Sequence, residues 1–123
     1  MANIMIVDDE PMARHVMRLG LERAGRSVVE AENGAAALAR LEDFPVDLVV
    51  TDIRMPVMDG VELIRRLNEC HPDIKVVAVS GGTMEGPGID GPNLPIRSEI
   101  GCAVAKPFSI ERLNEAVLRI LGS

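Results

Sequence analysis

Acidic residues directly follow two short apolar runs of this sequence. Asp8 and Asp9 come after the run at 3–7, and Asp52 comes after the run at 47–51. If both runs are strands of one parallel sheet, their carboxyl ends meet at one edge and bring the three carboxylates together. Carboxylates at such close range repel one another, and one of them takes up a proton unless a cation enters. The pattern therefore indicates a cation site.

Magnesium is the cation that we expect at this site. It prefers hard oxygen ligands, one or two protein carboxylates in direct contact, several retained waters and a substrate phosphate. Zinc is less expected, because His15 and His71 are predicted on helices away from the acids and neither cysteine has a suitably spaced partner. We therefore predict Mg²⁺ as the cofactor.

Two further polar residues follow apolar runs later in the chain. Ser80 follows the run at 74–79, and Lys106 follows the run at 102–105. Together with the acids they form a minimum set for phosphoryl transfer, which requires mainly positioning and charge neutralisation. In this reading Asp52 is the carboxylate nucleophile that forms an acyl phosphate. Lys106 and the metal offset the phosphoryl charge, and Ser80 donates a hydrogen bond to a phosphoryl oxygen.

Apolar runs alternate with helical patterns along the chain, and this alternation predicts the fold. We expect five strands, at 3–7, 27–30, 47–51, 74–79 and 102–105. Helices are expected to start near Pro11, Asn33, Asp59 and Ser109. Such alternation predicts a doubly wound α/β fold, with a parallel sheet and helices on both faces.

Helical spacing also predicts which side chains of the helices face the core. For the first helix these are Ala13, Val16, Met17, Gly20 and Ala24. For the helix that starts near residue 59 they are Leu63, Ile64, Leu67 and Cys70. For the last helix they are Leu113, Ala116, Val117 and Ile120.

The composition limits the class of protein. A chain of 123 residues fits one domain, and 47% apolar residues without Trp or Tyr predict an aliphatic core. The net charge of -6 argues against nucleic-acid binding. No apolar run approaches the roughly 20 residues that span a membrane, and the start lacks the features of a signal peptide. Cys70 and Cys102 are expected to be reduced thiols in or near the core, and the location is expected to be cytoplasmic.

Four stretches of the sequence resemble the receiver domains of two-component response regulators. They read IMIVDDEP at the start, VVTDIRMPVMDG around Asp52, AVSGG after the fourth run and AKPF around Lys106. The resemblance runs essentially from end to end. It implies the flavodoxin-like fold with strand order 2-1-3-4-5. It also implies that Asp52 is the phosphoacceptor, Ser80 the switch hydroxyl and Lys106 the invariant lysine.

The same resemblance implies a metal site and a set of partners. Asp8, Asp9, Asp52 and the backbone carbonyl of Arg54 correspond to the magnesium ligands. Receivers usually take the phosphoryl group from a histidine kinase or a histidine phosphotransfer protein, and they catalyse only their own phosphorylation and dephosphorylation. We expect residues 1–123 to form one receiver domain without an output domain. The signal would then leave through a surface that contacts an unknown downstream protein.

Two features depart from the receiver pattern. Ala103 stands where receivers usually carry Tyr or Phe three residues before the lysine. The segment at 81–95 is longer than usual and rich in Gly and Pro, so the helix that normally follows the fourth strand is expected to be short or displaced, with a candidate at 94–100. The segment is either a tolerated surface insertion or a functional loop. In the second case we hypothesise that phosphorylation orders or moves it in place of an aromatic relay.

Two other functions fit part of the pattern. A haloacid-dehalogenase-type phosphatase also uses an aspartate after a strand. Such enzymes carry a second acid two residues later, where this chain has Arg54. A receiver-like interaction module without phosphorylation is the other alternative, and the complete set of polar residues at the strand ends disfavours it.

The Arg54 side chain is either an ordinary surface charge or one that alters the lifetime of the acyl phosphate.

Overall fold

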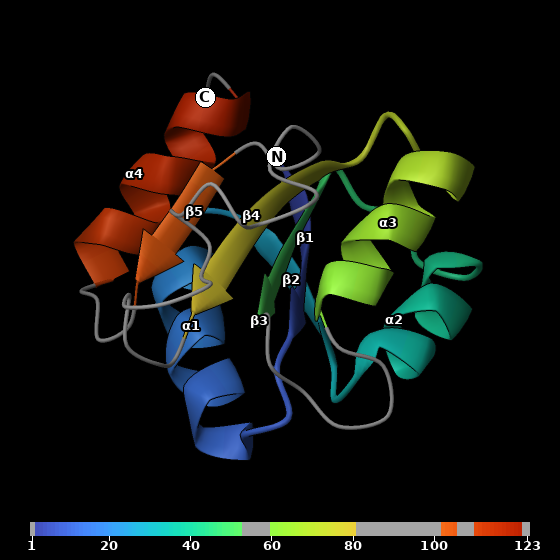
Figure 1. Ribbon diagram of the computed structural model, residues 1–123. Coiled ribbons are helices and arrows are strands. Elements are labelled where there is room, and N and C mark those ends of the chain that lie inside the picture. Colours follow the sequence, from blue (N-terminus) through green and yellow to red (C-terminus); the bar gives the residue numbers. More distant parts are fainter. Residues whose placement is uncertain (1, 53–59, 81–101, 106–109, 122–123) are drawn as a thin grey trace.

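A parallel sheet runs through the middle of the molecule, with helices on both of its faces (Figure 1). The computed structural model describes residues 2–52, 60–80, 102–105 and 110–121. Its strands are β1 (Asn3–Val7), β2 (Ser27–Ala31), β3 (Leu48–Asp52), β4 (Lys75–Ser80) and β5 (Cys102–Ala105). Its helices are α1 (Pro11–Arg23), α2 (Gly34–Leu41), α3 (Gly60–Cys70) and α4 (Ile110–Leu121).

The strands pair in the order β2-β1-β3-β4-β5, and each pairing is parallel. The predicted flavodoxin-like strand order is therefore confirmed. β1 and β3 lie inside the sheet, and residues of β3 are buried throughout the strand. This placement brings the carboxyl ends of β1 and β3 next to each other.

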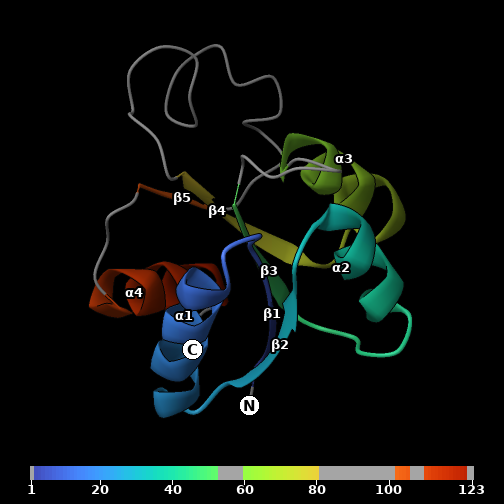
Figure 2. The same ribbon diagram turned by 90° about the horizontal axis from the view of Figure 1, so that it is seen from below.

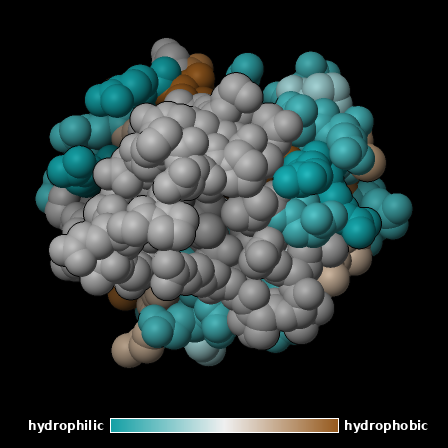
Figure 3. Space-filling model, in the orientation of Figure 1, coloured by the Kyte–Doolittle hydropathy of each residue, from teal (hydrophilic) through white to brown (hydrophobic). Residues whose placement is uncertain are grey.

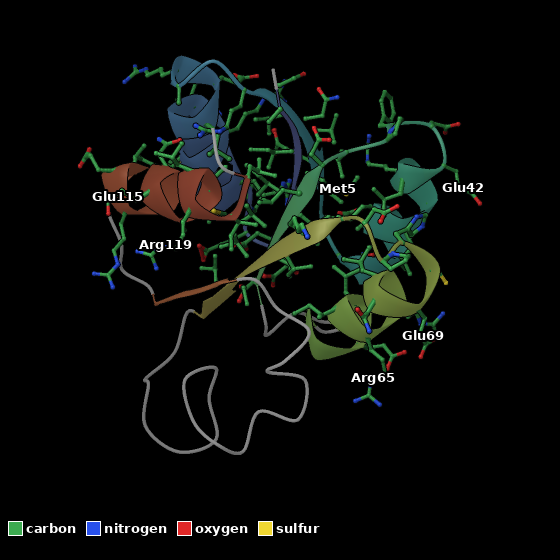
Figure 4. All side chains as sticks on the ribbon, turned by 90° about the horizontal axis from the view of Figure 1, so that it is seen from above. Met5, Glu42, Arg65, Glu69, Glu115 and Arg119 are labelled. Atoms are coloured by element: carbon green, nitrogen blue, oxygen red, sulfur yellow. The ribbon has the colours of Figure 1, made fainter. Side chains whose placement is uncertain are left out.

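Among the described helices, α1 and α4 cover one face of the sheet and α2 and α3 cover the other, as Figure 2 shows. Alternate residues of the strands supply the two cores, because successive side chains of a strand point to opposite faces. On β1, Ile4 and Ile6 pack toward α1 and α4, whereas Met5 and Val7 pack toward α2 and α3. Figure 4 shows Met5 between the sheet and the helices of its face. The core is aliphatic, as predicted.

Local signals in the sequence set the ends of the helices. Pro11 opens α1, where its missing N–H costs no helical hydrogen bond. Gly25 follows the end of α1 with φ +89°, a conformation that side chains other than glycine's rarely adopt. Asn33 caps α2, since its Oδ1 accepts the N–H of Ala36 at 2.8 Å. Hydrophilic side chains cover the outer surfaces of the helices on both sides of Figure 3.

The predicted inner face of α1 was partly wrong. Met17 and Gly20 are buried as expected, but Leu21 is also fully buried, and Val16 is 51% exposed. Compared with the predicted orientation, α1 is rotated about its own axis so that Leu21 packs against the sheet. The reason is that α4 packs beside α1 and fills the space next to Gly20. Val16 instead lines an open groove between α1 and α4. Ala24 lies beyond the last turn and is exposed.

The other predicted helix faces fit with one exception. Leu63, Ile64 and Leu67 of α3 are buried, and Leu113 lies in the other core. Cys70 is exposed, so its predicted place on the inner face of α3 was wrong. It is the last residue of α3.

Some predictions fall outside the described residues. These are the segment at 81–95, the short helix at 94–100, and the helix starts at Asp59 and Ser109. Among the described helices, none has the length and apolar character that a membrane crossing requires.

Candidate metal centre

The three predicted acids meet at the carboxyl edge of the sheet. Val7 of β1 pairs in register with Thr51 of β3, so the next residues, Asp8 and Asp52, leave the two strands side by side. The carboxylates of Asp8, Asp9 and Asp52 each offer an oxygen, and these oxygens all lie within 4.8 Å of one another. Among the described residues, this group has the spacing that a metal ion requires.

Burial differs among the three acids in a way that suits magnesium. Asp8 is 1% exposed and Asp52 is 8% exposed, whereas Asp9 is exposed to solvent. Buried carboxylates need a compensating charge or hydrogen bonds. Carboxylate oxygens within 4.8 Å of one another are the hard ligands that Mg²⁺ prefers. The open side at Asp9 leaves room for the waters that Mg²⁺ retains, so the residues fit this ion.

Hydrogen bonds fix the backbone on both sides of the site. Asp8 donates its N–H to the carbonyl of Ala31 at 3.2 Å, and its Oδ1 accepts the N–H of Glu10 at 2.9 Å. On the neighbouring strand, the hydroxyl of the fully buried Thr51 donates to the carbonyl oxygen of Asp52 at 3.0 Å. The acids therefore project from ordered backbone at the ends of two central strands.

The structure places the backbone of Ser80 at the same edge. Asp52 pairs with Val79 of β4, so Ser80 lies one position further along that strand. Ser80 itself pairs with Ala105, the last residue of β5. Arg54 and Lys106 lie outside the described residues, so the roles predicted for them stay predictions.

A chain of ion pairs next to Asp8 was missed by the sequence analysis. Arg14 and Arg18, one turn apart on α1, both bind Glu30 of β2. The hydrogen bond from Arg18, followed by that from Arg14, lowers the pKa of Glu30. Hydrogen bonds from Arg18 to Glu30 and Glu22 raise the pKa of Arg18. The signal in the sequence was the spacing of two arginines on one helix face opposite a single acid of the next strand.

Comparison with known proteins agrees with the fold. Residues 4–118 match the model of the response regulator receiver domain. The chain is 34% identical to the response regulator receiver protein CpdR of Brucella abortus, over 98% of both chains. It is 32% identical to the chemotaxis protein CheY of Bacillus subtilis, over 97% of both. It is 38% identical to the sensor kinase CckA of Brucella abortus over 98% of this chain, which corresponds to 12% of that protein.

Solved structures give the same result. A CheY-like receiver domain from Methanospirillum hungatei has a TM-score of 0.87 at 24% identity, covering 99% of this chain and 94% of that one, which supports the fold. The response regulator TrrA of Thermotoga maritima, solved in complex with Mg²⁺ and BeF, has a TM-score of 0.81 at 28% identity over 98% and 99% of the chains. The chain belongs to the response regulator receiver domain family, the phosphoacceptor class of two-component signalling.

Proposed function

We propose that Asp52 accepts the phosphoryl group and that Asp8, Asp9 and Asp52 hold the magnesium ion that the reaction needs. The observation that carries the proposal is the convergence of the three carboxylates, with oxygens within 4.8 Å of one another at the carboxyl edge of the sheet. Asp52 lies at the end of an interior strand and is only 8% exposed, a position that favours a fixed nucleophile over a mobile surface acid.

The chemical step is a displacement at phosphorus. A carboxylate oxygen of Asp52 attacks the phosphorus of the donor and forms the new P–O bond. The bond between phosphorus and the donor breaks, and the donor leaves with that electron pair. From a phosphohistidine the leaving group is an imidazole nitrogen. Bound magnesium supplies neutralisation of the charge on the phosphoryl oxygens.

The remaining site residues complete the proposal. The Lys106 ammonium would offset phosphoryl charge, and the Ser80 hydroxyl would donate a hydrogen bond to a phosphoryl oxygen. The backbone carbonyl of Arg54 would be a further magnesium ligand. The register between Ser80 and Ala105 supports the first two roles, because it brings the ends of β4 and β5 to the same edge as Asp52.

The donor and the output are also part of the proposal. We propose a histidine kinase or a histidine phosphotransfer protein as donor, and the similarity to a segment of the sensor kinase CckA supports this class of partner. The chain would act as one receiver unit, turn over no external substrate, and signal to a downstream protein without contacting nucleic acid. The free, exposed thiol of Cys70 supports a reducing, cytoplasmic location.

Intact-mass measurement after incubation with Mg²⁺ and acetyl phosphate tests the proposal. The parent chain is expected to gain one phosphoryl group, and Asp52→Asn is expected to gain none. Asp43→Asn is the matched control, because Asp43 is exposed in the turn that precedes β3, away from the carboxyl edge. A parent chain that gains no phosphoryl group, even with a kinase, would show an interaction module. Steady release of phosphate from an external ester would show a phosphatase.

A further inference from the structure

Arg14 connects the turn that carries the acids to the neighbouring strand. Its Nη1 donates a hydrogen bond of 2.7 Å to the carbonyl oxygen of Asp8, and its Nε donates one of 3.0 Å to Oε1 of Glu30. The two side chains of this ion pair are only 18% and 26% exposed. A single guanidinium group therefore ties the backbone at Asp8 to β2.

Glu30 is held from a second side. Its other oxygen, Oε2, accepts a hydrogen bond of 2.9 Å from Nη1 of Arg18. Arg18 in turn binds Glu22 through Nε at 3.1 Å. Because both oxygens of Glu30 are engaged, its carboxylate has a fixed orientation toward Arg14.

The charges along this chain of residues cancel. Two arginines, Arg14 and Arg18, are matched by Glu22 and Glu30. An isolated guanidinium next to three carboxylates would repel a divalent cation by its charge. Because the charges of these four residues sum to zero, Arg14 can donate its hydrogen bond to Asp8 while the group as a whole repels the metal ion only weakly.

The backbone of Asp8 is thus attached to β2 twice. Its N–H binds the carbonyl of Ala31, and its C=O is bound by Arg14, which Glu30 orients. The carboxylate of Asp8 also accepts the N–H of Glu10. These bonds set the direction in which the acidic pair leaves the sheet.

We propose that Arg14 is a positioning residue of the metal centre, oriented by Glu30, and that it raises magnesium affinity by fixing the backbone at Asp8. The proposal rests on the proposed function, since it concerns the acids assigned there to the metal. Groups that orient metal ligands from outside the coordination sphere typically change affinity 10- to 100-fold when removed. We expect an effect of roughly tenfold, at the low end of that range.

A positioning role of Arg14 and a purely electrostatic effect of its charge predict different results for substitutions at this residue. Arg14→Gln removes a positive charge near the acids, so charge alone would tighten magnesium binding. Loss of positioning weakens binding instead. Arg14→Lys keeps the charge but loses the planar fork that binds Asp8 and Glu30 together. It should therefore also weaken binding, whereas charge alone predicts no change.

Arg18→Gln is the matched control. It changes the net charge by the same amount and removes an ion pair to the same Glu30, but Arg18 has no described bond to Asp8. We expect its magnesium affinity to fall only about twofold, less than that of the Arg14 variants, because Glu30 loses one of its two restraints while Arg14 keeps its bonds to Asp8 and Glu30. A general loss of stability would affect the Arg18 variant as well as the Arg14 variants, so the comparison separates positioning from structure.

Isothermal titration calorimetry of the full chain with magnesium chloride alone measures the affinities. Amide hydrogen exchange at Glu10, in EDTA, provides a readout without metal. Weaker magnesium binding and several-fold faster exchange at Glu10 in both Arg14 variants would support the proposal. Binding by Arg14→Gln that equals or exceeds that of the parent would overturn it.

The two proposals fail in different ways. A parent chain that binds no magnesium would overturn the proposed function. In that case, exchange at Glu10 still decides the role of Arg14: unchanged exchange in Arg14→Lys and Arg14→Gln would overturn the positioning role. A parent that binds magnesium, with both Arg14 variants equal to it, would overturn the positioning role alone.

Discussion

Gly20 of α1 lies directly against the side chain of Ile110 at the start of α4. A methyl group placed on Gly20 would overlap that side chain. The same two helices are joined by Asn114, whose amide donates to the carbonyl of Gly20 at 3.4 Å and accepts from Nη1 of Arg26 at 2.8 Å. Because glycine carries only a hydrogen atom in place of a side chain, Gly20 lets α4 pack close to α1 and onto the sheet.

Gly20→Ala tests this packing. Alanine favours a helix over glycine by about 1 kcal/mol, but overlap with a packed side chain typically costs about 1–3 kcal/mol. We expect the variant to lower the free energy of unfolding by about 1 kcal/mol, as measured by urea denaturation.

Ile110→Ala provides the partner variant for a double-mutant cycle, because it removes all three side-chain atoms that the new methyl group would meet. The cost of Gly20→Ala should shrink in the Ile110→Ala background. A Gly20→Ala variant more stable than the parent by about 1 kcal/mol would show that Ile110 moves aside without cost.

Magnesium is expected to stabilise the folded chain, because the three acids come together only in that state. At a magnesium concentration 100 times the dissociation constant, the gain is about 2.7 kcal/mol. Urea denaturation with MgCl₂ and with EDTA measures it. Asp9→Asn should lose most of this gain, since it removes one of the three converging carboxylates.

The same Asp9→Asn variant should be more stable than the parent in EDTA at low salt. Carboxylate oxygens this close repel by about 1 kcal/mol in a water-like dielectric, and the substitution removes part of that repulsion. Asp43→Asn, which changes the net charge equally, serves as the control. A variant that behaves like Asp43→Asn under both conditions would contradict a metal centre at these acids.

The ion pairs of Glu30 should make stability depend on pH. Arg18, followed by Arg14, lowers the pKa of Glu30 below its ordinary value of 4.5. A carboxyl group whose pKa is lowered in the folded state stabilises the protein at pH values above its ordinary pKa. This stabilisation is lost as the pH falls through the pKa of the folded state. Glu30→Gln should therefore be less stable than the parent near pH 7, by about 1 kcal/mol.

Urea denaturation across the acidic range checks the sign of this effect. The difference between parent and Glu30→Gln should narrow as the pH falls below 4.5. Glu69→Gln is a suitable control, because Glu69 lies on the exposed outer side of α3 (Figure 4). A Glu30→Gln difference that stays constant from neutral to acid pH would contradict the assigned ion pairs.

The parts of the structure that follow from short-range rules could be predicted from the sequence. Alternating runs predicted the sheet, and the position of Asp8 and Asp52 directly after two strands predicted their meeting. The parallel register makes such an inference reliable, because the ends of neighbouring strands coincide at one edge. The side chains of Arg54 and Lys106 lie outside the described residues, so their roles remain predictions.

The features that the sequence analysis missed depend on how whole elements pack. Val16 was predicted to face the core and is exposed, whereas Leu21, for which no position was predicted, is fully buried. The difference arises because α4 occupies the space beside α1, which no periodicity within α1 reveals. Likewise, the pairing of Arg14 with Glu30 joins a helix to a strand 16 residues away. The distance between these two side chains depends on how far α1 lies from the sheet, which the sequence does not reveal.

The hydrogen bonds that fix the backbone at Asp8 determine which residues must stay together when the domain is recombined with a related one. Residues 2–31 contain the acidic pair together with Arg14, Glu30 and Ala31, which fix the backbone at Asp8. Asp52 comes from a separate segment and meets them through the pairing of β1 with β3. A chimera with a related receiver should therefore exchange the first 31 residues as one block, since α1 without its own β2 would separate Arg14 from Glu30.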